Sequence, residues 1–269
     1  MTPPRLLDHL ETAAAVLRRR PCGLIVDVDG TISVIAATPG AATVDPRCRE
    51  ALRALAGRLD LVAAVSGRPA AVVRQMVGLD GAVYVGNHGL ERWQEGRTVL
   101  PPAVAPFRPI VARALAEARA RLALPGLVFE DKGVVAAIHY RLSGAPEAAR
   151  AAILAVARAV AIGAGLVVAE GKLVVELRPP VARDKGTAVA ELVAERGLRG
   201  VWYLGDDRTD VAAFERLRRL RGAGDCAGLG IAVLGAETPA DVVRAADYFL
   251  AGVEEVAEAL EWLARLPPC

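Results

Sequence analysis

Short apolar runs alternate with longer amphipathic segments along much of this 269-residue chain. The strand-like runs include GLIVDVD, LDLVAAVSGR and AVYVGNHG, and the segments between them have helical periodicity. The alternation resumes near residue 183 and continues through GVWYLGDDRTD. Because this rhythm is typical of βαβ units, the sequence predicts an α/β fold with a Rossmann-like parallel sheet covered by helices. Ligands bind such sheets at the carboxyl ends of their strands.

The rhythm changes between these two stretches, after a Pro-rich segment at 101–109 that suggests a hinge. Helical runs at 107–123 and 146–162 are each followed by two strand-like runs. Each half therefore predicts a helix and a hairpin, with turns near Lys132-Gly133 and Glu170-Gly171.

We therefore expect two domains. Residues 1–96 and 181–269 would form the α/β core, and residues 97–180 would form an inserted α+β domain. The insert would thus split the core into two sequence segments.

Two further segments bear on membrane association. The N-terminal LLDHLETAAAVLRRR has the pattern of an amphipathic helix with acidic residues early and arginines late, unlike a signal peptide. The long apolar stretch AAILAVARAVAIGAGLVVAEG is interrupted by Arg158 and by glycines. We interpret it as a helix followed by a strand, not as a membrane span.

Composition and charge exclude several classes of partner. The chain is 54% hydrophobic, which suits sizeable cores, and its 33 basic residues nearly balance 31 acidic ones. This balance and the low aromatic content disfavour nucleic acid and anionic membranes as partners. The cysteines are widely spaced and suggest neither a zinc site nor a disulfide framework, which favours a cytoplasmic location: Cys22, Cys48, Cys226 and Cys269.

Aspartates follow two of the predicted strands. LIVDVDGTIS supplies Asp27 and Asp29, and GDDRTD supplies three more at 206, 207 and 210. If the two strands are neighbours, five carboxylates converge, and each like-charged pair about 4 Å apart costs roughly 4 kcal/mol at an effective dielectric of about 20. An oxygen-only set of this kind suits a hard cation, and Mg²⁺ with substrate phosphate is the natural candidate.

The two aspartates of DVDG are expected to differ in role. In an extended segment Asp27 and Asp29 point to one side with Val28 opposite. Asp27 can then act as nucleophile and metal ligand, while Asp29 reaches the leaving group as general acid and base. An isolated DVDGT would be interpreted as a solvated strand-to-loop turn, but the second acidic strand end favours function.

Two more residues suit a phosphate site. Ser66 ends LVAAVSGR and could hold a phosphoryl oxygen, be the N-cap of a helix starting near Pro69, or do both. Lys185 lies at a predicted helix start, where its charge opposes the helix dipole. It could neutralise a phosphoryl group, or be a solvated surface lysine.

The ordered set DVDGT, SGR, DKG and GDDRTD resembles the four motifs of the haloacid dehalogenase superfamily of phosphatases, and the insert resembles its larger cap type. GNHGLE, EDKG, HYR and VVELRP resemble trehalose 6-phosphate phosphatases within it. The resemblance implies an aspartyl-phosphate on Asp27, with Ser66 and Lys185 stabilising the transferred charge. It also implies Mg²⁺ held by five groups: the Asp27 side chain, the Asp29 carbonyl and Asp206, with Asp207 and Asp210 as direct or outer support.

The resemblance also implies that the insert contacts the sugar. Its candidate residues are Lys132, His139, Arg141 and Glu176. His139 could equally lie on the exposed face of an amphipathic strand, whereas a carboxylate inside KLVVELRP suits paired sugar hydroxyls.

Three core residues are further candidates for substrate binding. Asn87 and His88 could touch substrate or form a polar turn, and Arg68 could face phosphate or the surface. Val211 and Ala212 stand where relatives often have acidic residues, which puts outer support of the metal in doubt.

The resemblance implies a Mg²⁺-dependent trehalose 6-phosphate phosphatase, and we expect the protein to be a monomer. Sucrose phosphate, mannosylglycerate phosphate or a hexose phosphate is an alternative substrate, because cap loops set specificity. A regulatory module that only binds Mg²⁺ and phosphate is a third hypothesis, although it would not need Asp29.

Overall fold

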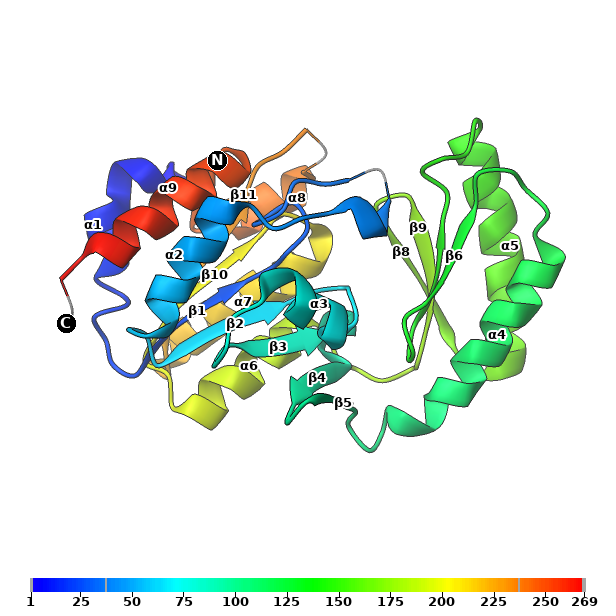
Figure 1. Cartoon of the computed structure of the whole chain (residues 1–269), viewed down its shortest axis with the longest axis horizontal. Helices are drawn as coiled ribbons and strands as arrows, with labels where there is room; N and C mark the ends of the chain where they lie inside the picture. Colours follow the sequence, from blue (N-terminus) through cyan, green and yellow to red (C-terminus); the bar gives the residue numbers. More distant parts are fainter. Residues whose placement is uncertain (1, 37, 237, 268–269) are drawn as a thin grey trace. The chain divides into compact units, whose positions relative to one another are not determined.

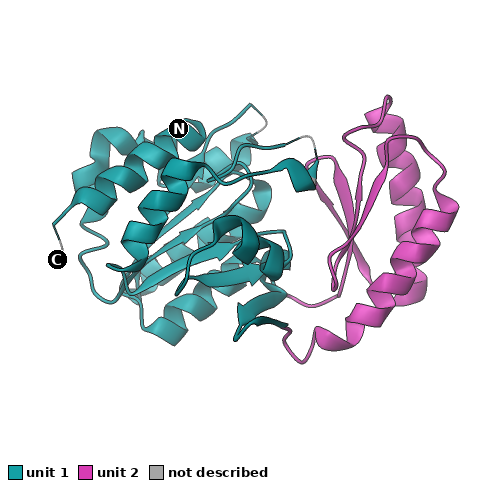
Figure 2. Cartoon of the chain, viewed as in Figure 1, with its two compact units in different colours: residues 1–98, 183–269 teal, residues 99–182 magenta. Residues whose placement is uncertain are grey.

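The computed structural model describes residues 2–36, 38–236 and 238–267. The chain divides into two compact units, which are residues 1–98 with 183–269 and residues 99–182 (Figure 2). The assignment of these units as catalytic core and cap stays a prediction.

The first unit is built on an eight-stranded sheet in the order β12-β11-β10-β1-β2-β3-β4-β5 (Figure 1). The strands from β12 to β3 pair in parallel, as the alternating pattern predicts, and β4 is antiparallel to β3. Their bounds are β1 Cys22–Val26, β2 Leu61–Val65, β3 Val83–Gly86, β4 Glu91–Gln94, β5 Arg97–Val99, β10 Gly200–Gly205, β11 Ala227–Val233 and β12 Tyr248–Leu250.

Helices cover both faces of this sheet (Figure 1), and the strand residues alternate between two cores. On β10, Trp202 and Leu204 join one core, while Val201 and Tyr203 join the other, because successive side chains of a strand point to opposite faces. The first core packs against α1 Leu10–Ala14, α2 Pro46–Ala56, α3 Ala70–Val77 and α9 Gly252–Arg265. The second packs against α6 Lys185–Arg196, α7 Arg208–Ala223 and α8 Ala240–Ala245.

Local signals explain where several helices begin and end. Asp45 accepts bonds from the amides of Arg47 and Cys48 at the start of α2, with Pro46 in the first turn. The α3 helix ends at Gly78, whose left-handed φ of 66° suits glycine. These caps fix the lengths of the helices that carry the loops at the strand ends.

The first unit differs from expectation at two places. The segment after β3 forms the antiparallel strands β4 and β5, which the sequence pattern did not predict because both runs are short and mostly polar. The single N-terminal helix expected over LLDHLETAAAVLRRR is wrong. It is a 3₁₀ turn, η1 Leu6–His9, followed by the short α1 and turns.

The second unit is a four-stranded antiparallel sheet, ordered β6-β7-β9-β8, with two helices packed on one face. It begins with η4 Ala105–Phe107, and its other elements are α4 Arg108–Arg121, β6 Val128–Asp131, β7 Ala136–His139, α5 Pro146–Ala164, β8 Val167–Gly171 and β9 Val174–Arg178. The helix-and-hairpin order is as predicted. The second turn lies at Lys172-Leu173, just after the predicted Glu170-Gly171, which still belong to β8.

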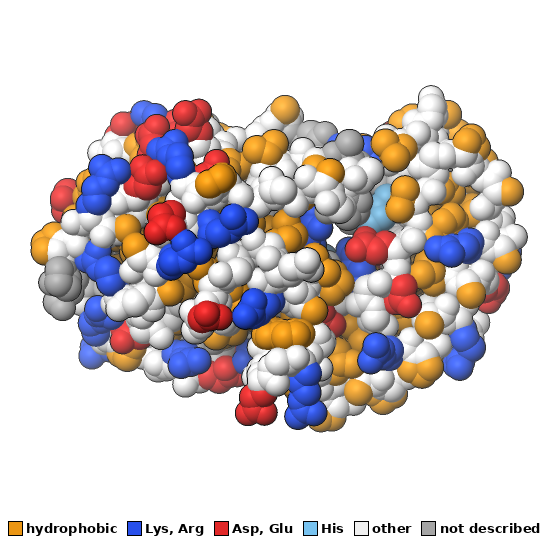
Figure 3. Space-filling model, viewed as in Figure 1, with side chains coloured by type: hydrophobic (Ala, Val, Ile, Leu, Met, Phe, Trp, Pro, Cys, Tyr) orange, Lys and Arg blue, Asp and Glu red, His pale blue; other side chains and the backbone are white. Residues whose placement is uncertain are grey.

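The long apolar stretch forms α5 and then β8, as expected. Within the described residues, no helix has both the length and the hydropathy needed to cross a bilayer. Basic and acidic side chains are interspersed on the visible face of the first unit (Figure 3). Burial raises the pKa of Cys48 to about 12 and that of Cys226 to about 11. Cys269 lies outside the described residues.

Trp202 offers a test of the first core. Its indole is fully buried and donates to the Ala13 carbonyl oxygen at 3.1 Å, which attaches α1 to β10. We expect Trp202→Phe to lower the free energy of unfolding by about 1–3 kcal/mol, because a buried hydrogen bond between α1 and β10 is lost. Urea unfolding followed by circular dichroism measures this, with half-buried Trp93→Phe as the control. Equal losses in both variants would contradict the assigned role of the bond.

Candidate functional site

The carboxyl ends of β1 and β10 bring three aspartates together. The two strands pair in parallel with Val26 opposite Leu204, and the Asp27 amide extends the ladder by donating to the Leu204 carbonyl at 2.9 Å. One carboxylate oxygen each of Asp27, Asp206 and Asp210 lies within 4.8 Å of the others, and all three residues are buried. An oxygen-only set of this spacing could hold a hard divalent cation.

Two of the five aspartates expected to converge have other contacts and do not belong to this cluster. Asp207 is the half-buried N-cap residue of α7, and its amide donates to Asp210 at 2.9 Å. Asp29 forms an ion pair with Arg68 at 2.6 Å. The expectation of five converging carboxylates is therefore corrected to three within the described residues, because the chain turns after each strand and carries the other two side chains away from the cluster.

Lys185 supplies the opposite charge within the cluster. It is the first residue of α6, after Asp184, whose carboxylate caps the helix by accepting from the Thr187 amide at 2.7 Å. The Lys185 ammonium lies 2.8 Å from Asp27 Oδ1 and 2.7 Å from Asp210 Oδ1, and the residue is 2% exposed. The alternative of a solvated surface lysine is thus wrong.

Burial and paired charges shift the ionisation of this cluster. Burial raises the pKa of the Asp27 carboxyl well above its ordinary value, although Lys185 acts in the opposite direction. Burial alone would lower the pKa of the Lys185 amine, but the adjacent Asp210 and Asp27 carboxylates raise it overall. Burial beside Asp210 raises the pKa of the Tyr203 phenol well above its usual range, so Tyr203 is a neutral donor.

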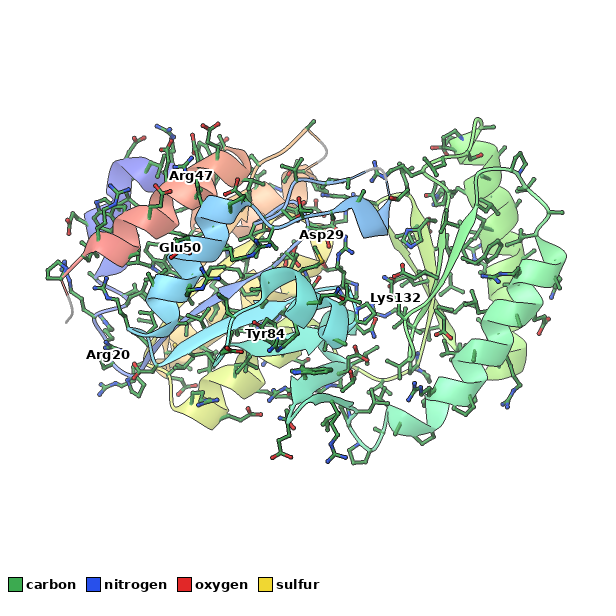
Figure 4. All side chains as sticks on the ribbon, in the orientation of Figure 1. Arg20, Asp29, Arg47, Glu50, Tyr84 and Lys132 are labelled. Atoms are coloured by element: carbon green, nitrogen blue, oxygen red, sulfur yellow. The ribbon has the colours of Figure 1, made fainter. Side chains whose placement is uncertain are left out.

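Arg68 holds both oxygens of Asp29. Its Nε and a terminal nitrogen donate to the two carboxylate oxygens at 2.6 and 2.7 Å, a bidentate geometry. The Arg68 side chain is only 14% exposed, so the alternative of a surface position is wrong, and its contact with phosphate stays a prediction. Asp29 (labelled in Figure 4) keeps 35% of its side chain exposed.

The loops after β2 and β3 are joined by backbone hydrogen bonds. The Asn87 amide donates to the Arg68 carbonyl and the His88 amide to the Ser66 carbonyl, both at 2.9 Å. The His88 ring packs so closely over Gly67 that a Cβ there would lie 2.6 Å from it. Asn87 is fully buried, and both Asn87 and His88 have left-handed φ angles, of 48° and 57°. Asn87 and His88 thus lie in a turn, η3 Asn87–Gly89, as the polar-turn alternative expected, and their contact with substrate stays a prediction.

Ser66 is buried at the end of β2, and its hydroxyl accepts from the Arg68 amide at 3.2 Å. It is not the N-cap of α3, contrary to one expectation, because that helix begins at Ala70 after Pro69. Glu91 of β4 accepts the bond from the Ala70 amide at 2.6 Å instead. The Ser66 side chain thus belongs to the turn around Gly67.

The second unit carries the remaining candidates. Lys132 (labelled in Figure 4) and Glu176 form an ion pair at 2.8 Å, with side chains 9% and 8% exposed. His139 Nε2 lies 2.7 Å from Glu130 Oε2 across the β6–β7 pair. Arg141 is half-buried in the turn after β7, contrary to the expectation that it lies on the hairpin strand. These side chains belong to the second unit, whereas the aspartate cluster belongs to the first.

Three contacting residues were not identified from the sequence as individual candidates. Tyr203 donates to Asp210 at 2.6 Å, Glu130 contacts His139, and Glu91 caps α3. A tyrosine within an apolar strand has the pattern of a core residue, so no local signal distinguishes Tyr203. The EDKG segment did contain Glu130, and an acidic residue two positions before Lys132 was the available signal.

Comparisons with known proteins identify the family. The trehalose-phosphatase family profile matches residues 25–254. A Mycobacterium tuberculosis trehalose-phosphate phosphatase is 38% identical over 79% of this chain and 55% of its own length. A second M. tuberculosis protein, named as an uncharacterized glycosyl hydrolase, is 38% identical over 80% of this chain and 17% of its own length. This chain thus spans about half or less of these curated relatives.

The fold is shared more widely than the sequence. The C-terminal domain of C. albicans trehalose-6-phosphate phosphatase matches 99% of each chain with a TM-score of 0.78 at 22% identity. The predicted α/β fold of the haloacid dehalogenase type is thereby confirmed. Because the family profile matches most of its length, this chain belongs to the trehalose-phosphatase family.

Proposed function

We propose that this protein hydrolyses trehalose 6-phosphate to trehalose and phosphate in a Mg²⁺-dependent reaction. The observation that carries the proposal is the buried cluster of Asp27, Asp206 and Asp210 around Lys185 at the strand ends. Family membership supports the choice of substrate. Phosphoryl transfer depends mainly on positioning and charge neutralisation, which such a cluster can supply.

The residues present fit a Mg²⁺ ion. The closest groups are carboxylates, with spacing and burial suited to a small hard cation that also binds substrate phosphate. We assign Asp27, the Asp29 carbonyl and Asp206 to hold it, with Asp207 and Asp210 as direct or outer support. Once bound, the ion would neutralise charge on the phosphoryl oxygens.

Asp27 and Asp29 would carry the covalent steps. Asp27 attacks phosphorus, the bond from phosphorus to the sugar oxygen breaks, and Asp29 gives its proton to that oxygen. Water then attacks the aspartyl-phosphate, and Asp29 takes its proton. Phosphate leaves and both carboxyl groups return to their starting states.

The other residues of the first unit would position charge. Lys185 and Ser66 would stabilise the transferring phosphoryl group. Arg68 orients Asp29 through its bidentate contact, and it would have to loosen that contact when Asp29 transfers a proton. Asn87 and His88 would contact substrate beside the Ser66 turn.

We assign residues 1–96 and 181–269 to a catalytic core and residues 97–180 to a cap that binds the sugar. The boundaries between the two compact units, at 98/99 and 182/183, support this division. Lys132, His139, Arg141 and Glu176 are the proposed sugar contacts. The buried pair of Lys132 and Glu176 supports specificity, since such a pair presents a fixed donor and acceptor to sugar hydroxyls.

Phosphate release provides the direct test. We expect trehalose 6-phosphate to be hydrolysed with Mg²⁺, and the rate to fall to background with EDTA and return with added Mg²⁺, because the carboxylate cluster needs a cation. Sucrose phosphate, mannosylglycerate phosphate and hexose phosphates are assayed in parallel. Equal or faster turnover of a monosaccharide phosphate would overturn the trehalose assignment. No activity on any ester would favour a module that only binds phosphate.

Asp27→Asn tests the nucleophile. We expect turnover to fall at least about 10³-fold with the circular dichroism spectrum unchanged, because an amide cannot attack phosphorus. The matched control is Asp225→Asn, which changes an exposed aspartate of the same unit. A near-normal rate in Asp27→Asn would mean that the nucleophile is misassigned.

Glu176→Ala tests the cap assignment. We expect kcat/KM for trehalose 6-phosphate to fall at least about tenfold more than for a small aryl phosphate, because only the sugar would use the lost acceptor. Glu170→Ala is the control, since Glu170 is exposed in the same unit and pairs with Arg150. Equal losses on both substrates, with a lower melting temperature, would assign Glu176 a structural role.

A further inference from the structure

Asp210 has its hydrogen-bonding capacity filled by this chain. It is 0% exposed, and its Oδ1 accepts from Lys185 Nζ at 2.7 Å and from the Tyr203 hydroxyl at 2.6 Å. Its Oδ2 accepts from the amides of Asp206 and Asp207 at 3.1 and 2.9 Å. A carboxylate offers about four lone-pair sites, so these four donors account for all of them.

These four hydrogen bonds distinguish Asp210 from Asp27 and Asp206 as a possible metal ligand. Spacing alone groups it with Asp27 and Asp206 as a possible metal ligand. A cation that bound Asp210 directly would have to displace one of the four donors, at the expense of a buried hydrogen bond. The contacts instead suit a fixed anchor for Lys185, which lies between Asp210 and Asp27.

Tyr203 is held rigidly as one of these donors. It lies in the middle of β10 and is 0% exposed. Its ring meets that of Phe214 edge-on, with centroids 5.8 Å apart. On the other side, a Cβ at Gly205 would overlap the Asp210 carboxyl group, so that group is closely enclosed. The hydroxyl therefore has little freedom to turn away from Asp210.

We propose that Tyr203 is a positioning residue of this site, which fixes Asp210 as the anchor of Lys185 and keeps it out of direct metal ligation. The inference rests on the proposed phosphatase function. Without the Tyr203 hydroxyl, Lys185 is the one donor left of the two that Asp210 Oδ1 has here. The carboxylate then draws the Lys185 ammonium away from Asp27. Lys185 would then neutralise the developing phosphoryl charge less well, although Tyr203 touches no substrate.

Kinetics of Tyr203→Phe test the proposal. We expect kcat on trehalose 6-phosphate and on a small aryl phosphate to fall about tenfold or more, with KM within about twofold. The matched control is Tyr84→Phe (Tyr84 is labelled in Figure 4), another buried tyrosine of this unit, whose hydroxyl bonds the Leu79 backbone. Its kcat should stay within about twofold even where its melting temperature falls. Equal kcat values in the two variants would overturn the proposal.

A double-mutant cycle separates positioning from structure. In an Asp210→Asn background, adding Tyr203→Phe should change kcat less than about twofold, because the hydroxyl acts through the carboxylate. An undiminished tenfold loss in that background would show that Tyr203 acts by another route, and would reject the proposal.

Calorimetric titration of Mg²⁺ into metal-free protein gives a readout that needs no turnover. Tyr203→Phe should keep the Kd for Mg²⁺ within about threefold, and Asp206→Asn should weaken Mg²⁺ binding at least about tenfold more than Asp210→Asn does. Equal weakening by Asp210→Asn and Asp206→Asn would refute the assignment of Asp210. An inactive wild-type protein would defeat the proposed function instead, and the Mg²⁺ titration would still decide the role of Asp210.

Discussion

A single ammonium group between two buried carboxylates is the interaction on which the strand ends of the first unit depend. Asp27, Asp210 and Lys185 are 4%, 0% and 2% exposed, so water compensates none of their charges. Removing one member of a buried ion pair typically costs about 3–5 kcal/mol, because the remaining charge stays buried. The end of β1 and the first turns of α6 and α7 must therefore stay within hydrogen-bond distance of one another. The two ion pairs of Lys185 therefore stabilise the fold and also fix the positions of the charges at the site.

The alternation of apolar and polar positions along the chain predicts much of this architecture. Strands such as LVAAV and GVWYLG are short and apolar, and parallel strands end at one edge, so Asp27 and Asp206 could be expected to meet. The alternation does not reveal which strands are neighbours, and it does not show how the chain turns after them. Asp29 and Asp207 therefore could not be separated from the cluster by pattern alone. The polar strands β4 and β5 were not predicted from the sequence for a related reason, because they lack an apolar run.

Contacts between distant segments account for the rest of what the sequence could not predict. Ser66 lies next to α3 in sequence, but the donor at the start of that helix is satisfied by Glu91, some twenty residues further on. Arg68 and Asp29 meet because the loops after β1 and β2 are adjacent. Tyr203 has the pattern of a core residue, and only its partner Asp210 distinguishes it. In each case the partner belongs to another element of the fold.

Two glycines of β11, which lie outside the sequence motifs, are also needed for the geometry of the site. A Cβ at Gly230 would come within 2.6 Å of the Phe214 ring, and one at Gly228 within 2.7 Å of Leu217, so both glycines let α7 approach the sheet closely. Phe214 packs against Tyr203, and the same helix carries Asp210. A side chain added at Gly230 would thus push away the helix that carries Asp210. Natural variation at Gly230 should therefore be narrow, although this glycine belongs to none of the sequence motifs.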